Sequence, residues 1–248
     1  MQNQENKREY IKVGLTNISY FQNNKFVQEK IFTSFNHKID YKILSVFDFV
    51  PKLLSNQHNF LEWEIIKGNT PTLNNENLMK IANNLKILHS SNLKFPPSNH
   101  ASRVKHYRKI LIEKNIQIKA LNDFYRLINK ILSNMNKNIP LHNDLWTRNM
   151  IQDEKGKIFF IDWEYATLGD IHFDLAYFIE SQELSNEQIN IFLNAYGPEF
   201  DEKILILHRI LVNSLVVMWA HSQQQLPFKT DIYENKMYIL NEQLQKFK

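Results

Sequence analysis

One beta-like interruption in a long helical stretch is the feature that most restricts how this chain can fold. Residues 141–150 (LHNDLWTRNM) place a histidine, two asparagines, an aspartate and an arginine among apolar residues. The overlapping segment 149–164 (NMIQDEKGKIFFIDWE) predicts two short strands around a turn at Glu154 to Gly156. Residues such as Leu141 and Met150 would anchor the loop in a core. We therefore expect the polar residues between them to face a cleft.

Composition narrows the class of protein. With 248 residues, of which 43% are hydrophobic, the chain can bury a sizeable core as one large domain or two lobes. It has no cysteine, which excludes disulfides, thiolate zinc sites and a cysteine nucleophile. The net charge of +4 is dispersed without a basic block, so we expect no nucleic-acid partner.

Two segments bear on localisation. The first ten residues, MQNQENKREY, are polar and unlike the apolar core of a secretory signal. The longest apolar run, at 204–220, contains His208 and Asn213 and falls short of the ~20 apolar residues that a membrane span needs. We expect a soluble, cytoplasmic protein without membrane insertion, and the sequence predicts no oligomeric state.

The first third of the chain predicts a small sheet. Residues 10–21 and 24–32 each read as a strand, with Asn23 and Asn24 as the hairpin turn between them. Asn36 is expected to cap a helix that runs to about residue 44, and Pro51 then interrupts regular structure.

The sheet is expected to end before a linker. Residues 59–68 (NFLEWEIIKG) read as another strand that ends at Gly68, and 68–71 (GNTP) form the predicted linker. Apolar residues then recur at helical spacing, which predicts a mainly helical remainder. The predicted helices lie at 78–88, 104–112, 116–135, 189–196, 204–221 and 232–247.

Four polar residues have a spacing that indicates phosphoryl transfer. His142, Asp144 and Asn149 are spaced as in the kinase catalytic loop, where the Asp takes the substrate hydroxyl proton and the Asn holds magnesium. Asp162 follows at the end of a predicted strand. Such a site needs a base beside the hydroxyl and oxygen ligands that hold Mg²⁺ against the phosphates. Each residue alone is commonly structural, but the ordered set favours a site.

These motifs resemble the choline kinase and aminoglycoside phosphotransferase branch of the protein-kinase-like fold. Residues 142–149 (HNDLWTRN) resemble its catalytic loop, and 161–180 (IDWEYATLGDIHFDLAYFIE) resemble its metal-binding segment. Residues 14–17 (GLTN) are similar to its phosphate-covering turn, and 36–41 (NHKIDY) to its N-R-x-x-E-Y helix start.

The resemblance implies an α+β, bilobal protein-kinase-like fold. A small N-terminal lobe with an antiparallel sheet, residues 1–68, would bind the nucleotide. A larger, mainly helical C-terminal lobe, residues 69–248, would carry the catalytic and acceptor-binding residues.

Carried over to this sequence, the resemblance assigns five residues to the catalytic centre. Asp144 would be the base, and Asn149 and Asp162 would hold Mg²⁺. His142 would brace the catalytic loop, and Asp174 would tie the loop down from the next helix.

The resemblance also implies a set of ATP contacts. Asp40 stands where the family has a glutamate that pairs with a basic strand residue, and Lys30 is the candidate partner, with Lys25 as a competitor. The implied ATP-binding residues are Gly14, Leu15, Thr16, Asn17, Lys30, Asp40, Ile65, Ile66 and Lys67, the last three through their backbone.

A quaternary ammonium acceptor would be held by aromatic faces and carboxylates. Val216 stands where choline kinases have a second Trp before the one matched by Trp219, which leaves ethanolamine or another amino alcohol open. The implied acceptor-binding residues are Asp144, Trp146, Glu164, Tyr165, Glu180 and Trp219.

We therefore expect an ATP- and Mg²⁺-dependent kinase of a small amino alcohol, with choline favoured as the acceptor. Kinases of ethanolamine, thiamine or an aminoglycoside are alternatives, as is a catalytically silent kinase-like module. The intact Asp144, Asn149 and Asp162 favour an enzyme. The last sixteen residues contain only two acidic side chains, which ranks a polycationic aminoglycoside acceptor lower.

Overall fold

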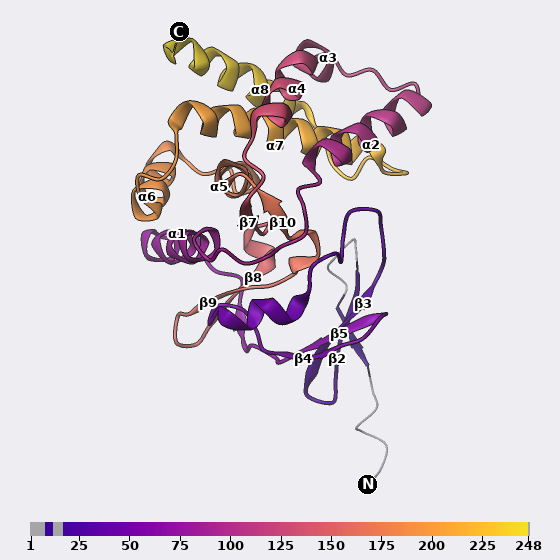
Figure 1. Cartoon of the computed structure of the whole chain (residues 1–248), viewed down its shortest axis with the longest axis vertical. Coiled ribbons are helices and arrows are strands. Elements are labelled where there is room, and N and C mark those ends of the chain that lie inside the picture. Colours follow the sequence, from indigo (N-terminus) through magenta and orange to yellow (C-terminus); the bar gives the residue numbers. More distant parts are fainter. Residues whose placement is uncertain (1–7, 12–16, 248) are drawn as a thin grey trace.

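The N-terminal third forms an antiparallel sheet at one end of the molecule (Figure 1). The structure is a computed structural model that describes residues 8–11 and 17–247. The strands lie in the order β1-β2-β3-β5-β4. They are β1 (Glu9–Tyr10), β2 (Asn17–Gln22), β3 (Lys25–Lys30), β4 (Leu53–Asn56) and β5 (Phe60–Trp63).

The predicted hairpin turn is confirmed. Asn23 and Asn24 have φ angles of 51° and 55°, and Gln22 pairs with Lys25 across them. Two successive positive φ angles match the twist of the flanking strands, and asparagine tolerates this conformation better than most residues.

Two predictions for this lobe are wrong, and one strand was not predicted. Asn36 does not begin a helix, because its buried side chain bonds the backbone of Thr33 and Ile31; Asp40 instead caps a short 3-10 helix, η1 (Tyr41–Val46). Strand β4 after Pro51 was not predicted. The strand expected to reach Gly68 ends at Trp63. Gly68 instead begins a separate short strand, β6 (Gly68–Asn69), which pairs with Asp153 and Gln152 of the other lobe.

The remainder of the chain is mainly helical, as predicted. The expected helix at 116–135 is divided at Phe124 into α3 and α4. The helices are α1 (Asn75–His89), α2 (His100–Glu113), α3 (Lys119–Asp123), α4 (Tyr125–Asn134), α5 (Ile171–Ser181), α6 (Asn186–Tyr196), α7 (Glu202–Ser222) and α8 (Asp231–Gln243), followed by the 3-10 segment η4 (Leu244–Phe247).

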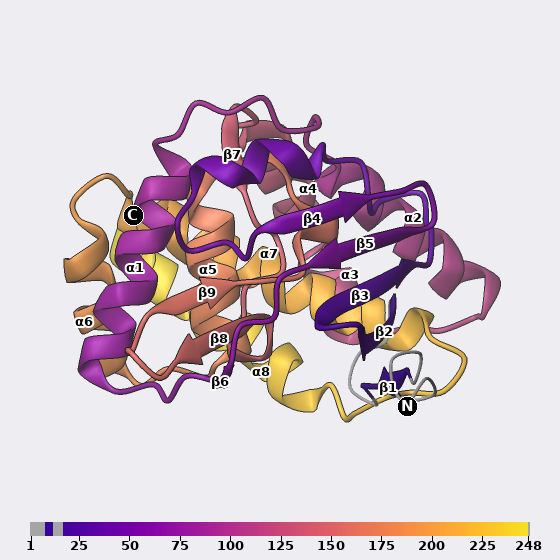
Figure 2. The ribbon, with the colours of Figure 1, turned by 90° about the horizontal axis from the view of Figure 1, so that it is seen from below.

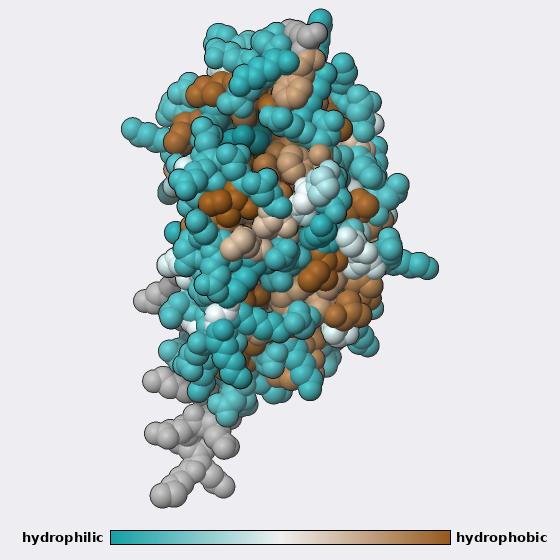
Figure 3. Space-filling model, turned by 90° about the vertical axis from the view of Figure 1, so that its left-hand side faces the viewer, coloured by the Kyte–Doolittle hydropathy of each residue, from teal (hydrophilic) through white to brown (hydrophobic). Residues whose placement is uncertain are grey.

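Helix α7 is the central helix of this lobe and packs against α5, α8 and α2. It is long and apolar enough to cross a membrane by length and composition, but 67% of its apolar window is buried inside the protein. Its apolar residues therefore serve the core. Figure 3 shows a largely hydrophilic face on which apolar side chains form separate patches.

Two small sheets lie between the N-terminal sheet and the helices. Strands β7 (Ile139–Leu141) and β10 (Thr167–Gly169) pair with each other, and β8 (Met150–Asp153) and β9 (Ile158–Phe160) form the predicted second hairpin. Figure 2 shows β8 and β9 beside α1. These sheets hold the catalytic-loop segment and the segment after β9 at the boundary of the two lobes.

Candidate active site

Apolar anchors hold the polar decapeptide between β7 and β8. Leu141, Leu145 and Met150 are buried, which explains why apolar and polar residues alternate so closely in this segment. Asp144 between them is only half-buried, and the loop closes in a 3-10 turn, η2 (Thr147–Asn149). The apolar residues anchor the loop as predicted, but the polar residues do not all face a cleft, because His142, Asn143 and Asn149 are buried as well.

Asp174 on α5 bonds the backbone of this loop. Its two carboxylate oxygens accept hydrogen bonds from the peptide nitrogens of His142 and Asn143, each at 2.8 Å, and His89 Nε2 lies 3.2 Å from Oδ2. Burial by itself would raise the pKa of Asp174, but these partners hold that pKa below its ordinary value. A charged side chain thus fixes the path of the loop backbone.

The side chain of His142 points into the core. Its Nε2 donates to the carbonyl of Ile161 at 3.0 Å, and its ring packs 4.5 Å from that of Trp163. Burial lowers the pKa of His142 to about 4, so the ring is neutral at pH 7. His142 therefore joins the catalytic loop to the segment after β9 and does not face the cleft.

Asp144 and Asn149 form a directly bonded pair. Asn149 Nδ2 donates to the backbone oxygen of Asp144 at 2.8 Å and to its Oδ2 at 3.0 Å, which leaves Asn149 Oδ1 for another ligand. The other carboxylate oxygen, Oδ1, accepts from the hydroxyl of Tyr177. Burial raises the pKa of Asp144 to about 6, and the Tyr177 hydrogen bond opposes this rise. The carboxylate is ionised at neutral pH.

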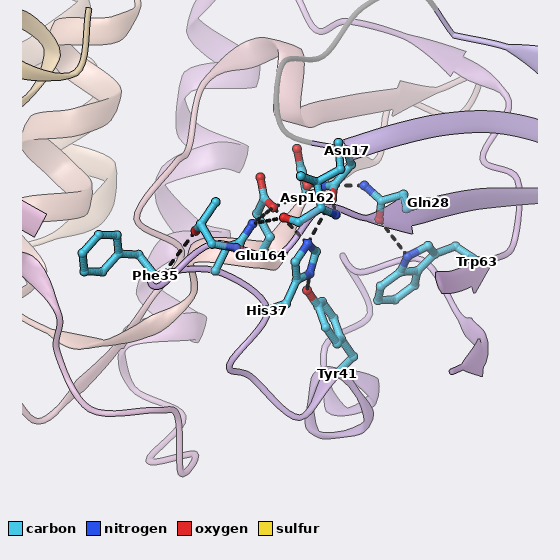
Figure 4. A network of polar contacts seen from close by, with 11 residues as sticks. Asn17, Gln28, Phe35, His37, Tyr41, Trp63, Asp162 and Glu164 are labelled. Carbon is cyan, nitrogen blue, oxygen red and sulfur yellow. Dashed lines mark hydrogen bonds and ion pairs between the residues drawn. The ribbon is translucent and has the colours of Figure 1, made fainter. Parts of the chain in front are cut away.

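Asp162 directly follows the residue after β9 and has a strained backbone. Its φ of 63° and ψ of 57° are left-handed, a conformation that non-glycine residues adopt mainly at turns and functional sites. Gln28 of β3 donates to Asp162 Oδ1 at 3.3 Å. Because the Trp63 indole can only donate, its 3.1 Å bond to Gln28 Oε1 fixes the amide orientation. Figure 4 shows this chain of contacts from β5 to Asp162.

Glu164 joins the two lobes. Its Oε2 accepts from Asn17 at 3.2 Å and Asn36 at 2.9 Å, and His37 Nε2 lies 3.1 Å away (Figure 4). Its other oxygen, Oε1, is buried without a hydrogen-bond partner among the described residues. The resemblance assigned Glu164 to the acceptor, but in the structure its bonded oxygen contacts the N-terminal lobe.

The carboxylates at this boundary fit a divalent cation. Burial, together with the negative charges of Glu164 and Asp144, raises the pKa of Asp162 to about 8. Hard cations such as Mg²⁺ prefer oxygen ligands, and their charge would relieve this repulsion. Asn149 Oδ1 and the Asp162 carboxylate are the oxygens that fit this role.

The predicted pairing of Lys30 with Asp40 is wrong. Lys30 Nζ donates to Asn56 Oδ1 at 2.9 Å and to the backbone oxygen of Gln57 at 2.7 Å, at the turn between β4 and β5. Asp40 caps η1 by accepting from the Lys42 nitrogen. Lys30 and Asp40 thus each stabilise a nearby turn and do not contact each other.

The alternative, Lys25, pairs with Glu62 at 2.8 Å. The β3 side chain that reaches the metal-binding segment is Gln28, two residues before Lys30.

The other ATP contacts stay predictions. Gly14, Leu15 and Thr16 lie outside the described residues, whereas Asn17 begins β2 and bonds Glu164. Residues 65–67 (Ile65, Ile66 and Lys67) connect β5 to β6 and so link the two lobes. The backbone there is where the resemblance places the adenine.

Trp146 and Tyr165, two of the predicted acceptor-binding residues, do not form an open aromatic cage, because each lies against an arginine. The guanidinium of Arg148 lies 5.1 Å from the ring centre of Trp146, and that of Arg103 lies 5.1 Å from the ring centre of Tyr165. One face of each ring is therefore already used by a cation.

Two further predicted acceptor-binding residues, Glu180 and Trp219, lie on α5 and α7. Glu180 is buried and bonded to Arg209 and Asn213, with Lys236 Nζ at 3.6 Å. Its charge is therefore already balanced inside the protein, which disfavours its predicted contact with the acceptor. Trp219 stacks on Phe228 with ring centres 6.2 Å apart.

Sequence reasoning missed five site residues. Gln28, Asn36 and His37 come from the N-terminal lobe, and Tyr177 and Arg103 come from helices. Tyr177 lies in the quoted motif three residues after Asp174, so one helical turn along α5 could have indicated it. Asn36 and His37 begin the quoted motif at 36–41, so that motif could have indicated them. Gln28 and Arg103 lie far from the loop in sequence and outside any quoted motif, and spacing carries no signal for them.

The fold, the bonded pair of Asp144 and Asn149, and Asp162 after β9 define a kinase-like phosphotransferase. The choline kinase LicA from Streptococcus pneumoniae has a TM-score of 0.75 at 19% identity, covering 96% of this chain and 94% of that chain. A choline/ethanolamine kinase family protein from Mesorhizobium loti has a TM-score of 0.75 at 16% identity, covering 97% and 89%. An ADP-bound aminoglycoside phosphotransferase has a TM-score of 0.60 at 16% identity, covering 96% and 93%. The α+β, bilobal kinase-like fold is thereby confirmed.

Sequence relatives identify the family. Residues 43–205 match the phosphotransferase enzyme family. The protein LicA homolog of Mycoplasma capricolum is 44% identical over 224 residues, covering 90% of this chain and 93% of the relative. That of Metamycoplasma hominis is 43% identical over 241 residues, covering 95% and 96%. The chain belongs to the phosphotransferase enzyme family and is a small-molecule kinase of the LicA and choline kinase type.

Proposed function

We propose that this kinase phosphorylates the hydroxyl of choline with ATP and Mg²⁺ and releases phosphocholine and ADP. The observation that carries the proposal is the half-buried Asp144, whose carboxylate is bonded on one side to Asn149 and on the other to Tyr177. The choice of choline is supported by the likeness to LicA proteins, one of which is described as a choline kinase. A cytoplasmic location, where ATP is available, is part of the same proposal.

Asp144 acts as the proton acceptor in this reaction. The acceptor oxygen forms a bond to the γ-phosphorus, the bond from that phosphorus to the ADP oxygen breaks, and the hydroxyl proton moves to the Asp144 carboxylate. With its pKa near 6, Asp144 is ionised at pH 7 and still basic enough to take the proton.

Asn149 and Asp162 are the proposed Mg²⁺ ligands. When bound, the metal supplies positive charge that offsets the charge on the phosphate oxygens. Gln28 holds one Asp162 oxygen, and Asp174 holds the peptide groups beside Asp144. These contacts keep the base and the metal ligands at fixed positions, on which phosphoryl transfer depends.

A panel of acceptors tests the function. Choline, ethanolamine, thiamine and an aminoglycoside would each be assayed with Mg-ATP by release of ADP. We expect the highest kcat/KM for choline and phosphocholine as the product. A higher kcat/KM for ethanolamine would replace choline as the acceptor, and no ADP release with any alcohol would support a silent module.

A further inference from the structure

His37 bonds Glu164 of the C-terminal lobe through both its backbone and its side chain. Its peptide nitrogen donates to the backbone oxygen of Glu164 at 2.8 Å, and its Nε2 lies 3.1 Å from Glu164 Oε2 (Figure 4). Both side chains are only 1% exposed. A hydrogen bond to a carboxylate is stronger when it is shielded from water in this way. The N-terminal lobe therefore holds Glu164 at two points through one residue.

The partners of the His37 ring determine which nitrogen carries a proton. Nε2 faces two acceptors, Glu164 Oε2 and, at 3.0 Å, Asn17 Oδ1, so this nitrogen donates. The assignment of Asn17 Oδ1 follows from Asn17 Nδ2, which donates to the same Glu164 oxygen. The second ring nitrogen, Nδ1, lies 2.7 Å from the hydroxyl of Tyr41, which can donate to it. Both ring nitrogens are thus bonded, and these bonds fix the orientation of the ring.

The backbone of His37 has an uncommon conformation. Its φ of 51° is left-handed, which is unfavourable for a residue with a side chain unless the surrounding contacts hold it. The side chain of the preceding residue, Asn36, donates to the same Glu164 oxygen at 2.9 Å. Consecutive side chains of an extended segment point to opposite sides. The left-handed turn therefore lets two neighbouring side chains reach one carboxylate.

The segment that His37 holds contains a proposed metal ligand, Asp162, two residues before Glu164. The other bond across this boundary joins Gln28 of β3 to Asp162 Oδ1 at 3.3 Å. That bond is longer than the usual N–H···O distance of about 2.9–3.0 Å, so it is weak. The contacts at Glu164 are shorter and more numerous. They therefore control how far β3 lies from the metal-binding segment.

We propose that His37 is a positioning residue that sets the spacing of the two lobes at the Mg-nucleotide site by holding Glu164. Among the described residues its ring bonds Glu164, Asn17 and Tyr41, and neither the base nor a metal ligand. It thus acts on the site only through position. This inference rests on the proposed function, because it takes the boundary beside Asp162 as the place where Mg-ATP binds.

His37→Phe and His37→Gln test the assignment as a pair. Phenylalanine keeps a ring but removes both nitrogens, whereas glutamine keeps an N–H donor. We expect the dissociation constant of Mg-ATP to rise at least about fivefold in His37→Phe, because a bond to a charged group is lost and the ligand must then bring the lobes together. The KM for choline should not change. His37→Gln should recover part of the Mg-ATP affinity.

His58→Phe is the matched control. His58 also belongs to the N-terminal lobe, and its ring packs on Phe32 as the His37 ring does, with ring centres 5.4 Å and 5.5 Å apart, respectively. It is exposed and lies in the turn between β4 and β5. Its substitution should leave the dissociation constant of Mg-ATP unchanged.

Three results would overturn the proposal. If His37→Phe lowers the melting temperature while the dissociation constant of Mg-ATP stays constant, His37 only stabilises the fold. If His37→Gln binds Mg-ATP as weakly as His37→Phe, the N–H donor does not position the site. If the KM for choline rises in parallel with the dissociation constant of Mg-ATP, the effect is not confined to the nucleotide.

Glu164→Gln keeps the test decisive if His37→Phe does not fold. It removes the charge that His37 bonds and retains the shape of the side chain, so we expect weaker Mg-ATP binding here as well. Unchanged Mg-ATP affinity in Glu164→Gln would contradict the inference, because His37 is proposed to act by holding this carboxylate.

Titration with Mg-ATP needs no acceptor, which separates this inference from the proposed function. If the wild-type protein binds Mg-ATP but phosphorylates no choline, the proposed function fails, and the comparison of His37→Phe with His58→Phe still tests His37. Weaker binding in His37→Phe alone would support the positioning role. Equal binding in both variants, or no binding of Mg-ATP by the wild-type protein, would contradict it.

Discussion

At the scale of single residues, Asp162 combines backbone strain with electrostatic repulsion. Its left-handed backbone and its raised pKa both cost folding free energy, and Gln28 offsets only part of that cost with a neutral hydrogen bond. Backbone strain and perturbed pKa values of this kind occur mainly at functional sites, where a bound ligand can relieve the unfavourable free energy. Asp144, held between Asn149 and Tyr177, is the second such residue.

Asp144→Asn tests the base. The amide keeps the shape of the side chain but cannot take the hydroxyl proton, and positioned proton transfer is typically worth about 10²–10⁴ in rate. We expect kcat to fall by at least about 10² while Mg-ATP still binds. Steady-state kinetics and nucleotide titration measure the two quantities, and near-normal turnover would remove Asp144 from this role.

Asp162→Asn tests the metal ligand. Asparagine tolerates the left-handed backbone, so the variant removes the charge without adding strain. We expect nucleotide affinity in the presence of Mg²⁺ to fall at least about tenfold, because a direct oxygen ligand loses its charge. Nucleotide titrations with and without Mg²⁺ report the effect, and the exposed Glu154→Ala serves as the control. Equal Mg²⁺ dependence in the wild-type protein and Asp162→Asn would contradict the assignment.

At the scale of elements, helix α5 organises the catalytic loop. Asp174 bonds two loop peptide groups and Tyr177, one turn later, bonds Asp144. The loop also receives support from α2, because His100 bonds Asn143 at 2.9 Å. The loop has little regular structure of its own, so its conformation depends on these two helices.

Asp174→Asn tests this dependence. The new amide would turn an N–H₂ group toward one of the two peptide donors and leave that donor unpaired. We expect a loss of about 2–4 kcal/mol in the free energy of unfolding and a lower kcat. Asp153→Asn is the control, because Asp153 also accepts from two peptide nitrogens but is the last residue of β8, away from the catalytic loop. Urea unfolding curves compare them, and equal effects would contradict a special role for α5.

At the scale of the whole molecule, buried histidines couple stability to pH. Burial lowers the pKa of His100 to about 3 and that of His142 to about 4, against an ordinary value of 6.5. Between the ordinary pKa of 6.5 and these lowered folded pKa values, the unfolded chain therefore binds more protons than the folded protein. Stability is complete above pH 6.5 and is lost as the pH falls toward the folded pKa values.

We expect the free energy of unfolding to fall by about 1.4 kcal/mol per pH unit for each of these histidines below pH ~6. Urea unfolding from pH 7.5 to pH 4.5 measures the slope. His100→Gln can still bond Asn143 but does not titrate, so its slope should be smaller by one group. An identical slope in that variant would show that His100 does not contribute.

The sequence by itself determined the features that lie within short stretches of chain. The loop at 141–150, the hairpin after it and the turn at Asn23 and Asn24 follow from local spacing and turn preference, and all three are present. The kinase-like fold was implied by the resemblance of the sequence motifs to the choline kinase and aminoglycoside phosphotransferase branch, and the structure has that fold.

Only the tertiary structure decided which distant side chains meet. Gln28 and not Lys30 reaches Asp162, because turns on either side of β3 fix the strand register and the path of Lys30. Glu180 is balanced by Arg209 on α7, and Arg103 on α2 lies over the ring of Tyr165. These pairs are separated by many residues in the chain, and a difference of one or two positions along a strand or helix changes the partner. That choice depends on the packing of whole elements, which local sequence patterns do not encode.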